Sequence, residues 1–479
     1  MNYEPVIGLE VHLQLSTTTK LFCGCLTKFG APPNSQTCPV CLGLPGVLPV
    51  LNERVLEWGV RVALAFDCRL ADVMKFDRKQ YFYPDLPKNY QISQYDKPLA
   101  QHGHLDIVTD GHSKRIGITR IHLEEDAGKL LHEASETESL VDFNRTGVPL
   151  LEIVSEPDLR SAEEAYQYLV SLKAIIQYLG VSTCNMEEGS LRCDTNVSLR
   201  KTGASAFGSK VEIKNLNSFR AVKQALEYEM KRQAALLERG DRIPQETRLW
   251  DAKGLKTEPM RSKEGAADYR YFPEPDLVPF VISRELVDRV KATLPELPAQ
   301  RCARLQSAYQ LSVYDAQVLT QERVLADLFE GAIKASAEPK PVANWIMGDF
   351  SAYLNAKGLE PGAVKLRPEW LAHLIELVDN GTISGRMAKD VFVQMVERGM
   401  DPVELVKASG LQQIADPQVL ERLAEEILQA NPKSVEDYLK GKTNALLHLM
   451  GQAMKRSQGK ANPQQLTEIL KRKLEQAKV

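Results

Sequence analysis

Acidic residues and a histidine occupy alternate positions in several segments of the N-terminal half of this 479-residue chain. Between Ile7 and Leu15, for example, Glu10 and His12 alternate with apolar residues. The residues of metal-ligand type in these segments are Glu10, His12, Glu124, Glu125, Asp194 and Glu212. Carboxylates repel one another unless cations neutralise them, and oxygen ligands with one imidazole suit Mg²⁺ or Mn²⁺ bound to nucleotide phosphates. The pattern predicts a metal-dependent phosphate site, although simple solvent exposure is the commoner origin of such alternation.

Glu124 and Glu125 are adjacent, so a regular strand would direct their side chains to opposite faces. For both carboxylates to serve one site, the strand must end or bulge at this point. The following residues, Asp126, Ala127 and Gly128, permit such an irregularity.

Four of the eight cysteines form a second group of potential metal ligands. Cys23 and Cys25 form one pair, and Cys38 and Cys41 form another after a turn-rich loop. Four thiolates can bind Zn²⁺ tetrahedrally and leave no coordination position open for catalysis. We therefore predict a structural zinc site that fixes this loop, with four free thiols as the alternative.

The elements expected to position the charged side chains are strands and helices of one antiparallel sheet domain. Apolar and polar residues alternate over 7–15, 116–124, 191–199 and 210–214. Two amphipathic segments supply helices for the apolar face: one begins with a Ser161/Glu164 capping box, and the other stops at Gly240. The pattern predicts a sheet that is covered on one face and polar on the other.

The remainder of the chain is helical in pattern, which predicts an α+β domain followed by two all-α domains. Helical periodicity begins after the LPELP segment at 294–298, and a turn-like break follows Gly399. The predicted boundaries are 1–295, 296–406 and 407–479.

The charge balance constrains any nucleic-acid partner. The chain has 60 Lys and Arg against 63 Asp and Glu, a net charge of −3, so nucleic acid could be bound only by a local excess of cations. Residues 433–479 contain ten Lys and Arg against four Asp and Glu. Either a solvated helical face or a nucleic-acid contact would account for this excess.

No stretch approaches the roughly 20 apolar residues of a membrane span, and the N-terminus lacks the pattern of a targeting peptide. We expect a cytoplasmic protein without a membrane partner.

Two loop-like segments, 78–98 and 260–277, mix aromatic and basic residues, including Lys79 and Lys88. Such residues pack on nucleotides or RNA ends, but they also pack loops internally. The chain contains neither a Walker A loop nor G-x-G-x-x-G, so a nucleotide would be bound in another kind of site.

Taken together, these segments resemble the B subunit of the aspartyl/glutamyl-tRNA(Asn/Gln) amidotransferases in its bacterial form. The matching runs span nearly the whole chain in order. They are GLEVHLQL, CPVCLGLPGVLPVLN, RKQYFYPDLPKNYQISQ, HLEEDAGK, DFNRTGVPLLEIVSEPD, RCDTNVS, EIKNLNSF, DYRYFPEPDL, ANWIMGD and GKANP.

The resemblance implies a catalytic cradle domain, whose sheet is similar to that of glutamine synthetase, then a helical domain and a tRNA-binding tail. It also implies a ligase that forms a carbon–nitrogen bond with glutamine as amido donor. ATP would phosphorylate the side-chain carboxylate of misacylated Glu-tRNA(Gln) or Asp-tRNA(Asn), and ammonia would displace the phosphate. Phosphorylation suits the charged sheet, because a carboxylate lacks a good leaving group and divalent metals offset the charge of phosphoryl transfer.

The resemblance also assigns roles to individual residues. The expected ligands of one Mg²⁺ are Glu10, His12 and Glu125. The expected ligands of a second are Glu124, Asp194 and Glu212. Lys79 and Lys88 are expected to contact phosphate or line a route for ammonia.

Partners follow from the same resemblance. The chain shows no amidase signature of Ser and Lys, so ammonia is expected from the glutaminase (A) component of the amidotransferase. Misacylated tRNA and a small C component would complete the assembly. The alternative is a non-catalytic, zinc-stapled scaffold that binds tRNA.

Overall fold

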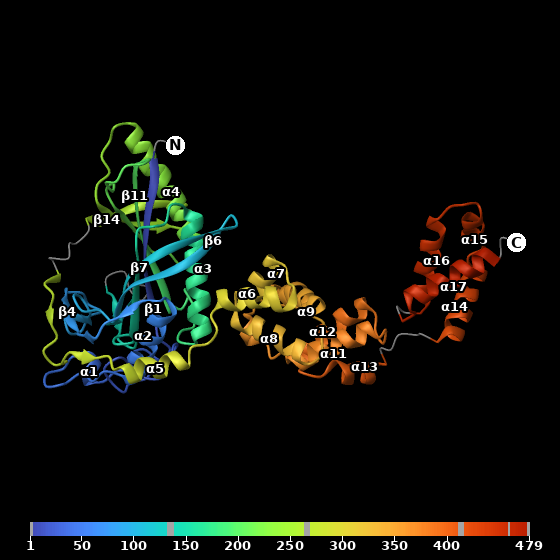
Figure 1. Ribbon diagram of the computed structural model, residues 1–479, viewed down its shortest axis with the longest axis horizontal. Coiled ribbons are helices and arrows are strands. Elements are labelled where there is room, and N and C mark those ends of the chain that lie inside the picture. The colour runs from blue at the N-terminus through green and yellow to red at the C-terminus, as the bar shows by residue number, and fades with distance from the viewer. Residues whose placement is uncertain (1–2, 132–137, 263–268, 411–415, 458–459, 477–479) are drawn as a thin grey trace. The chain divides into compact units, whose positions relative to one another are not determined.

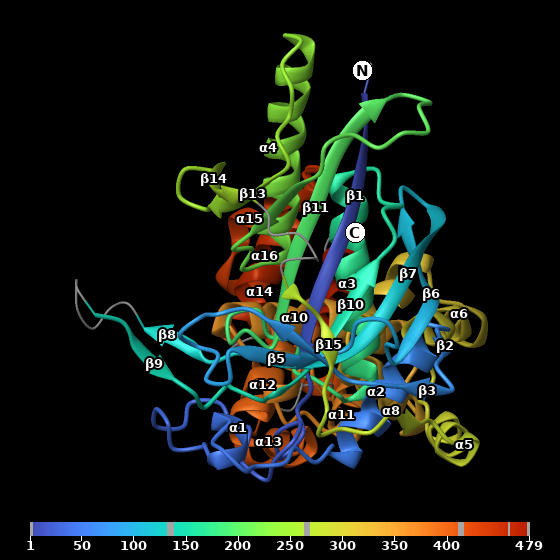
Figure 2. The same cartoon turned by 90° about the vertical axis from the view of Figure 1, so that its left-hand side faces the viewer.

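A nine-stranded sheet forms the centre of the first of two compact units, Met1–Pro298 (Figures 1 and 2). The computed structural model describes residues 3–131, 138–262, 269–410, 416–457 and 460–476. In order across the sheet, the strands are β14 (Lys256–Ser262), β13 (Glu246–Asp251), β12 (Val211–Lys214), β11 (Leu191–Lys201), β1 (Tyr3–Gln14), β10 (Pro149–Ser155), β7 (His112–Glu125), β6 (Ala100–Thr109) and β2 (Arg69–Leu70). Neighbouring strands are antiparallel except β12 and β13, which are parallel.

Three smaller sheets and five named helices complete this unit within the described residues. The sheets are β15 (Phe272–Pro273) with β4 (Asp77–Gln80) and β5 (Tyr90–Ser93), β16 (Phe280–Val281) with β3 (Val73–Met74), and β8 (Lys129–Leu131) with β9 (Leu140–Asp142). The helices are α1 (Pro39–Leu42), α2 (Glu53–Ala65), α3 (Ala162–Leu179), α4 (Phe219–Glu238) and α5 (Arg284–Ala292).

Alternation along β1 separates a buried face of the large sheet from a polar one. Ile7, Leu9 and Val11 are at most 1% exposed and belong to one core with residues of α2, α3 and α4. Glu10 and His12, at the intervening positions, remain partly exposed. The helices therefore cover the apolar face, and the polar face stays available for a site.

The ends of α3 and α4 explain where these helices begin and stop. The Ser161 hydroxyl accepts a hydrogen bond from the Glu164 backbone N–H at 3.1 Å, and Gly180 ends α3 with φ of 68°. Ser218 caps α4 in the same way, and Gly240 follows its end with φ of 82°.

The second unit, Ala299–Val479, is helical throughout its described elements and contains two separate hydrophobic cores. The helices of the first core are α6 (Pro298–Tyr309), α7 (Val313–Thr320), α8 (Arg323–Lys334), α9 (Pro339–Trp345), the π-helix η2 (Ile346–Phe350), α10 (Ser351–Lys357), the 3₁₀ turn η3 (Pro361–Ala363), α11 (Pro368–Asp379), α12 (Gly385–Arg398) and α13 (Pro402–Ser409). Those of the second are α14 (Pro417–Ala430), α15 (Pro432–Leu439), α16 (Asn444–Arg456) and α17 (Pro463–Gln476). The predicted α+β class with helical C-terminal parts is confirmed. In the described part of the chain, no helix has the length and apolar character needed to cross a membrane.

Candidate active site

Four adjacent strands bring the alternating polar residues to one face of the large sheet. His12 on β1 pairs with Arg192 on β11 and with Glu152 on β10, and Glu152 pairs in turn with His122 on β7. Two residues before His12 on the same strand, Glu10 pairs with Asp194 across β1 and β11. We call this surface the polar face.

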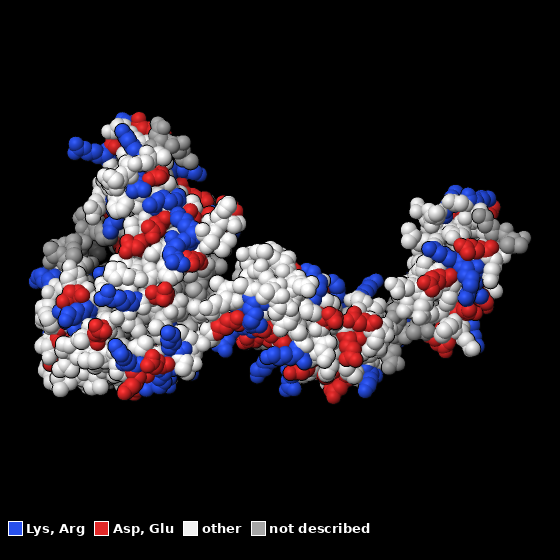
Figure 3. Space-filling view, viewed as in Figure 1, with Lys and Arg blue, Asp and Glu red and all other residues white. Residues whose placement is uncertain are grey.

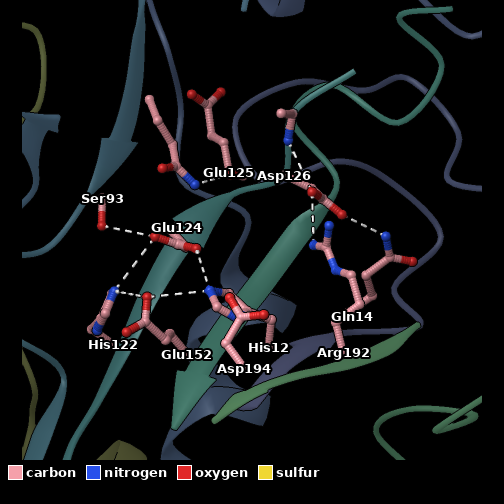
Figure 4. Close-up of polar contacts among 12 residues, drawn as sticks. His12, Gln14, Ser93, His122, Glu124, Glu125, Asp126, Glu152, Arg192 and Asp194 are labelled. Atoms are coloured by element: carbon pink, nitrogen blue, oxygen red, sulfur yellow. Dashed lines mark hydrogen bonds and ion pairs between the residues drawn. The ribbon is translucent and has the colours of Figure 1, made fainter. Parts of the chain in front are cut away.

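His12, Glu124 and Glu152 form a compact cluster on the polar face (Figure 4). Their potential ligand atoms all lie within 4.8 Å of one another. The His12 Nε2 atom is 3.4 Å from a Glu152 carboxylate oxygen and 3.8 Å from one of Glu124. Two buried carboxylates and one half-buried imidazole have the chemistry of a divalent cation site. We call these residues the histidine–glutamate cluster.

His122 lies beside this cluster on the polar face and supports its carboxylates. Its Nε2 atom is 3.3 Å from Glu152 and 3.5 Å from Glu124, and the Ser93 hydroxyl donates a hydrogen bond to Glu124 at 3.1 Å (Figure 4). Burial disfavours the charged imidazole, but the Glu152 and Glu124 carboxylates outweigh it and raise the pKa of His122 to about 9. His122 therefore helps to neutralise two buried carboxylates that would otherwise repel each other.

The other three acidic residues of the polar face are each held by a neighbour. Glu10 accepts a hydrogen bond from the Asn196 amide at 2.8 Å. The Lys214 Nζ atom donates a hydrogen bond to the Asp194 carboxylate at 2.7 Å and lies 3.7 Å from a carboxylate oxygen of Glu212. These three carboxylates and the histidine–glutamate cluster line one cavity of about 700 Å³, which we call the large cavity.

Lys79 lines the same cavity together with tyrosine rings. Its Nζ atom lies 5.0 Å from the ring centre of Tyr269 and 5.9 Å from that of Tyr81, both within cation–π range. Burial lowers the pKa of Lys79, but the Glu124 carboxylate reverses this effect and holds the pKa above its usual value. Lys79 is therefore a half-buried cation near the buried Glu124 carboxylate.

Arg192 lies beside His12 on the polar face and is held in place by Asp126. Its guanidinium donates to the buried Asp126 carboxylate at 2.8 Å, and the Gln14 amide donates to the same carboxylate at 2.6 Å (Figure 4). Both Arg192 and Asp126 line the large cavity, so a fixed cation borders the acidic cluster.

Glu125 is not brought to the polar face. The pairs Pro149 with Glu125 and Leu150 with Glu124 show that β7 stays regular to its end, so the adjacent carboxylates point in opposite directions (Figure 4). Glu125 instead accepts hydrogen bonds from Lys88 at 2.7 Å and from the Ile92 backbone at 3.2 Å. The expected grouping of Glu125 with Glu10 and His12 is thus not the arrangement in the structure, because the strand has no bulge at this point.

Glu125 and Lys88 line a smaller cavity of about 190 Å³ on their side of the strand, which we call the small cavity. The cysteine loop supplies much of its remaining lining, including Cys41 and Leu44. The two cavities therefore lie on either side of the end of β7.

Several residues of the site were not singled out from the sequence, among them Glu152, His122, Arg192 and Asp126. Glu152 is a lone acidic residue in the apolar run of β10, and this interruption was the available signal. His122 shares an alternating face with Glu124, but the pattern did not distinguish a supporting residue from a solvent-exposed one.

The four predicted zinc ligands converge, and their Sγ atoms lie within 4.8 Å of one another. All eight cysteines of the chain are free thiols. A hydrogen bond with Cys23 lowers the pKa of Cys41 below that of a free thiol, and the backbone N–H of Cys38 donates to its sulfur at 3.2 Å. A set of four converging thiols with one favoured as a thiolate fits a tetrahedral zinc site.

The basic excess of residues 433–479 is partly offset by acidic residues of α14. Arg472 bonds Glu421 at 2.5 Å, and Lys473 bonds Glu425 at 2.7 Å. Figure 3 shows Lys and Arg side chains beside Asp and Glu side chains over these helices. Lys440, Lys442 and Arg456 also form ion pairs, with Glu436, Asp437 and Glu426 respectively. The acidic residues that offset the excess therefore lie both in α14 and within 433–479.

Comparison with known proteins places the chain in a family over nearly its whole length. Residues 5–288 match the GatB/GatE catalytic domain, and residues 327–474 match the GatB domain. The B subunit of the aspartyl/glutamyl-tRNA(Asn/Gln) amidotransferase of Carboxydothermus hydrogenoformans is 58% identical over 475 residues, covering 98% of this chain and 99% of the relative. The protein of the same name from Caldanaerobacter subterraneus subsp. tengcongensis is 56% identical over 99% of this chain and 100% of the relative. That from Synechococcus sp. (strain JA-3-3Ab) is 53% identical over 99% of this chain and 98% of the relative. This chain therefore belongs to the family of the B subunits of the aspartyl/glutamyl-tRNA(Asn/Gln) amidotransferases.

Proposed function

We propose that this chain catalyses the ATP-dependent amidation of misacylated Glu-tRNA(Gln), Asp-tRNA(Asn) or both. The name shared by its relatives describes such an amidotransferase, and the identity extends over the whole catalytic region. The observation that carries the proposal is the histidine–glutamate cluster in the wall of the large cavity. This cluster lies within the part of the chain that matches the catalytic domain.

The chemistry of amidation explains why such a cluster is needed. A carboxylate resists attack by ammonia because it has no good leaving group, and conversion to an acyl phosphate supplies one. Mg²⁺ bound at this site would offset the negative charge that gathers during phosphoryl transfer. His12, Glu124 and Glu152 would hold one ion. Glu124 thus joins His12 and not, as expected from the resemblance, Asp194 and Glu212. Glu10, Asp194 and Glu212, which line the same cavity, are the proposed ligands of a second ion.

The cations around the large cavity have complementary roles in this proposal. Arg192, held by Asp126, and Lys79, half-buried near Glu124, would contact phosphate oxygens. Because Asp126 and the neighbouring rings hold them in place, little side-chain entropy would be lost on binding.

Ammonia would reach the acyl phosphate from the small cavity. That cavity contains both charged side chains, Lys88 and Glu125, and apolar residues such as Leu44 and Val47. An enclosed route keeps ammonia unprotonated and therefore nucleophilic. Since Glu124 and Glu125 are adjacent, the route would open next to the metal ligands.

The proposal includes the partners that supply and present the substrates. The glutaminase (A) component would release ammonia, the small C component would brace the pair, and misacylated tRNA would bind through the helices of 407–479. The zinc ion would be held by Cys23, Cys25, Cys38 and Cys41 and would stabilise the loop beside the small cavity. The assembly is proposed to work in the cytoplasm.

The test uses this chain reconstituted with its glutaminase and small C components. Glu152→Gln keeps the size of the side chain but removes a charged ligand, so Glu-tRNA-dependent ATP hydrolysis and amidation should fall at least about 10-fold. Binding of tRNA should be unchanged. The matched control is Glu187→Gln, an exposed residue of the same unit. Full activity of Glu152→Gln would refute a catalytic polar face and favour a tRNA-binding scaffold, and assays with both misacylated tRNAs would identify the substrate.

A further inference from the structure

Lys20 is a fully buried cation beside the cysteine cluster. Its side chain is 0% exposed, and its Nζ atom lies 3.6 Å from the Sγ atom of Cys41 and 3.4 Å from the carbonyl oxygen of Phe143. Within the described residues, these are the two hydrogen bonds of the ammonium group. A buried charge costs free energy unless an opposite charge offsets it, and a carbonyl oxygen supplies only a partial charge. Of the two acceptors of the Lys20 ammonium, Cys41 is the one that can carry a full compensating charge, as a thiolate.

The reverse requirement holds for the cysteine cluster. A zinc ion bound by four thiolates carries two net negative charges, which also need compensation where water is excluded. Cys41 is the buried member of the four, whereas the other three are half-buried. The least hydrated part of the cluster therefore lies next to Lys20.

We propose that Lys20 is a positioning residue of the zinc site: its charge offsets that of the zinc thiolates and joins the site to the catalytic domain. This inference rests on the zinc site proposed above. Backbone hydrogen bonds support the second role. The Lys20 N–H donates to the Cys25 carbonyl at 3.0 Å, and the Leu21 N–H donates to the Gly147 carbonyl at 2.9 Å.

Gly147 shows how close the zinc site lies to the small cavity. Its φ of +79° favours glycine, and a Cβ atom there would lie 3.6 Å from the Cys41 Cβ, 3.6 Å from the Lys20 Cδ and 3.7 Å from a Glu125 carboxylate oxygen. Gly147 is thus the position at which the zinc site, Lys20 and Glu125 all come close together. Loss of the Lys20 charge should weaken zinc retention most directly, and should disturb the position of Glu125 as a secondary effect.

The experiment measures the rate at which the purified full-length chain releases zinc to a chromogenic chelator. Lys20→Met removes the charge at nearly constant volume and should raise the release rate by about 10- to 100-fold. Lys20→Arg keeps the charge and should release zinc at close to the wild-type rate. The matched control is Lys28→Met, which removes an exposed cation from the same loop and should leave the rate unchanged.

The outcomes distinguish failure of the zinc proposal from failure of the role proposed for Lys20. Wild-type protein without zinc would refute the zinc site, whereas zinc-loaded wild type with unchanged release from Lys20→Met would refute only the role of Lys20. If Lys20→Met does not fold, Lys20→Gln replaces it as the neutral variant and Lys20→Arg decides the question. Rapid release from folded Lys20→Arg would show that packing rather than charge retains zinc, and would overturn the proposal.

Discussion

The two carboxylates of the histidine–glutamate cluster lie against two imidazoles in a region nearly closed to solvent. Glu124 is 2% exposed and Glu152 8%, while His122 beside them is 2% exposed. When no metal ion is bound, protonated imidazole can balance these charges together with the nearby Lys79. The pKa values of the carboxylates and of His122 therefore move in opposite directions, the former down and the latter up.

This arrangement predicts a pH-dependent stability in magnesium-free buffer. The pKa of His122 is about 9 in the folded chain, against 6.5 for an ordinary histidine. The stabilisation that protonated His122 gives the folded chain is therefore fully present below pH 6.5 and is lost as the pH rises through 9. The loss is at most about 3 kcal/mol. Urea unfolding at pH 6.5 and 9.5 measures it.

His122→Gln is the control for this prediction, because the variant has no titrating group at position 122. It should show a smaller fall in stability between the two pH values than the wild type. Equal falls would mean that His122 does not carry the effect.

Glu125 is the residue for which sequence and structure lead to different roles. The family resemblance grouped it with Glu10 and His12 as a metal ligand, whereas the structure pairs it with Lys88 in the small cavity. Glu125→Gln should therefore lower glutamine-supported amidation by about an order of magnitude while high ammonium chloride still supports the reaction. Parallel assays of Gln-tRNA formation with the two nitrogen sources make the comparison. An equal loss with both sources would instead place Glu125 in the chemistry itself.

At the scale of elements, the alternating strands were predictable because one face of each is buried. The predicted runs at 7–15, 116–124, 191–199 and 210–214 correspond to β1, β7, β11 and β12. The central strand β10 was not predicted, since its residues are buried on both faces and its sequence does not alternate. Glu152 was missed for the same reason.

Contacts between distant segments were the other part that local patterns could not supply. Lys88 lies in a loop whose sequence allowed either a nucleotide contact or internal packing. Only the fold shows that its stem packs on the end of α1 and that its ammonium reaches Glu125.

The packing of Lys88 on α1 gives a prediction for Gly43. This residue ends α1 with φ of 66°, and a Cβ atom there would lie 2.2 Å from the Cγ atom of Lys88. Gly43→Ala should displace Lys88 and weaken the coupling of glutamine use to amidation, as measured by the ratio of glutamate released to Gln-tRNA formed. The matched control is Gly46→Ala in the same loop, where φ is also positive, at 86°, but an added Cβ meets no atom within 4 Å. Similar ratios of glutamate released to Gln-tRNA formed in the two variants would contradict the proposed effect of Gly43 on Lys88.

At the scale of the whole molecule, the chain combines a sheet-centred unit with helices that have two cores of their own. Opposite charges also gather in the two parts. Carboxylates of the first unit gather around the large cavity, whereas 433–479 carries the local excess of cations. A net charge of −3 therefore describes neither part.

Removal of residues 407–479 should weaken tRNA binding while the first unit stays folded, since the two have separate cores. Filter binding at several salt concentrations measures the effect, and the dependence on salt should become less steep in the truncated chain. Circular dichroism and zinc content check that the first unit is intact. Unchanged affinity and salt dependence would contradict the role assigned to the tail.

The regular end of β7 has a consequence for how the two cavities respond to one another. Glu124 lines the large cavity and Glu125 the small cavity, so adjacent residues of one strand contribute a side chain to each. A shift of this strand end would therefore change the lining of both cavities at once. If ammonia passes through the small cavity as proposed, its arrival and its use at the polar face would be linked through the backbone of these two residues.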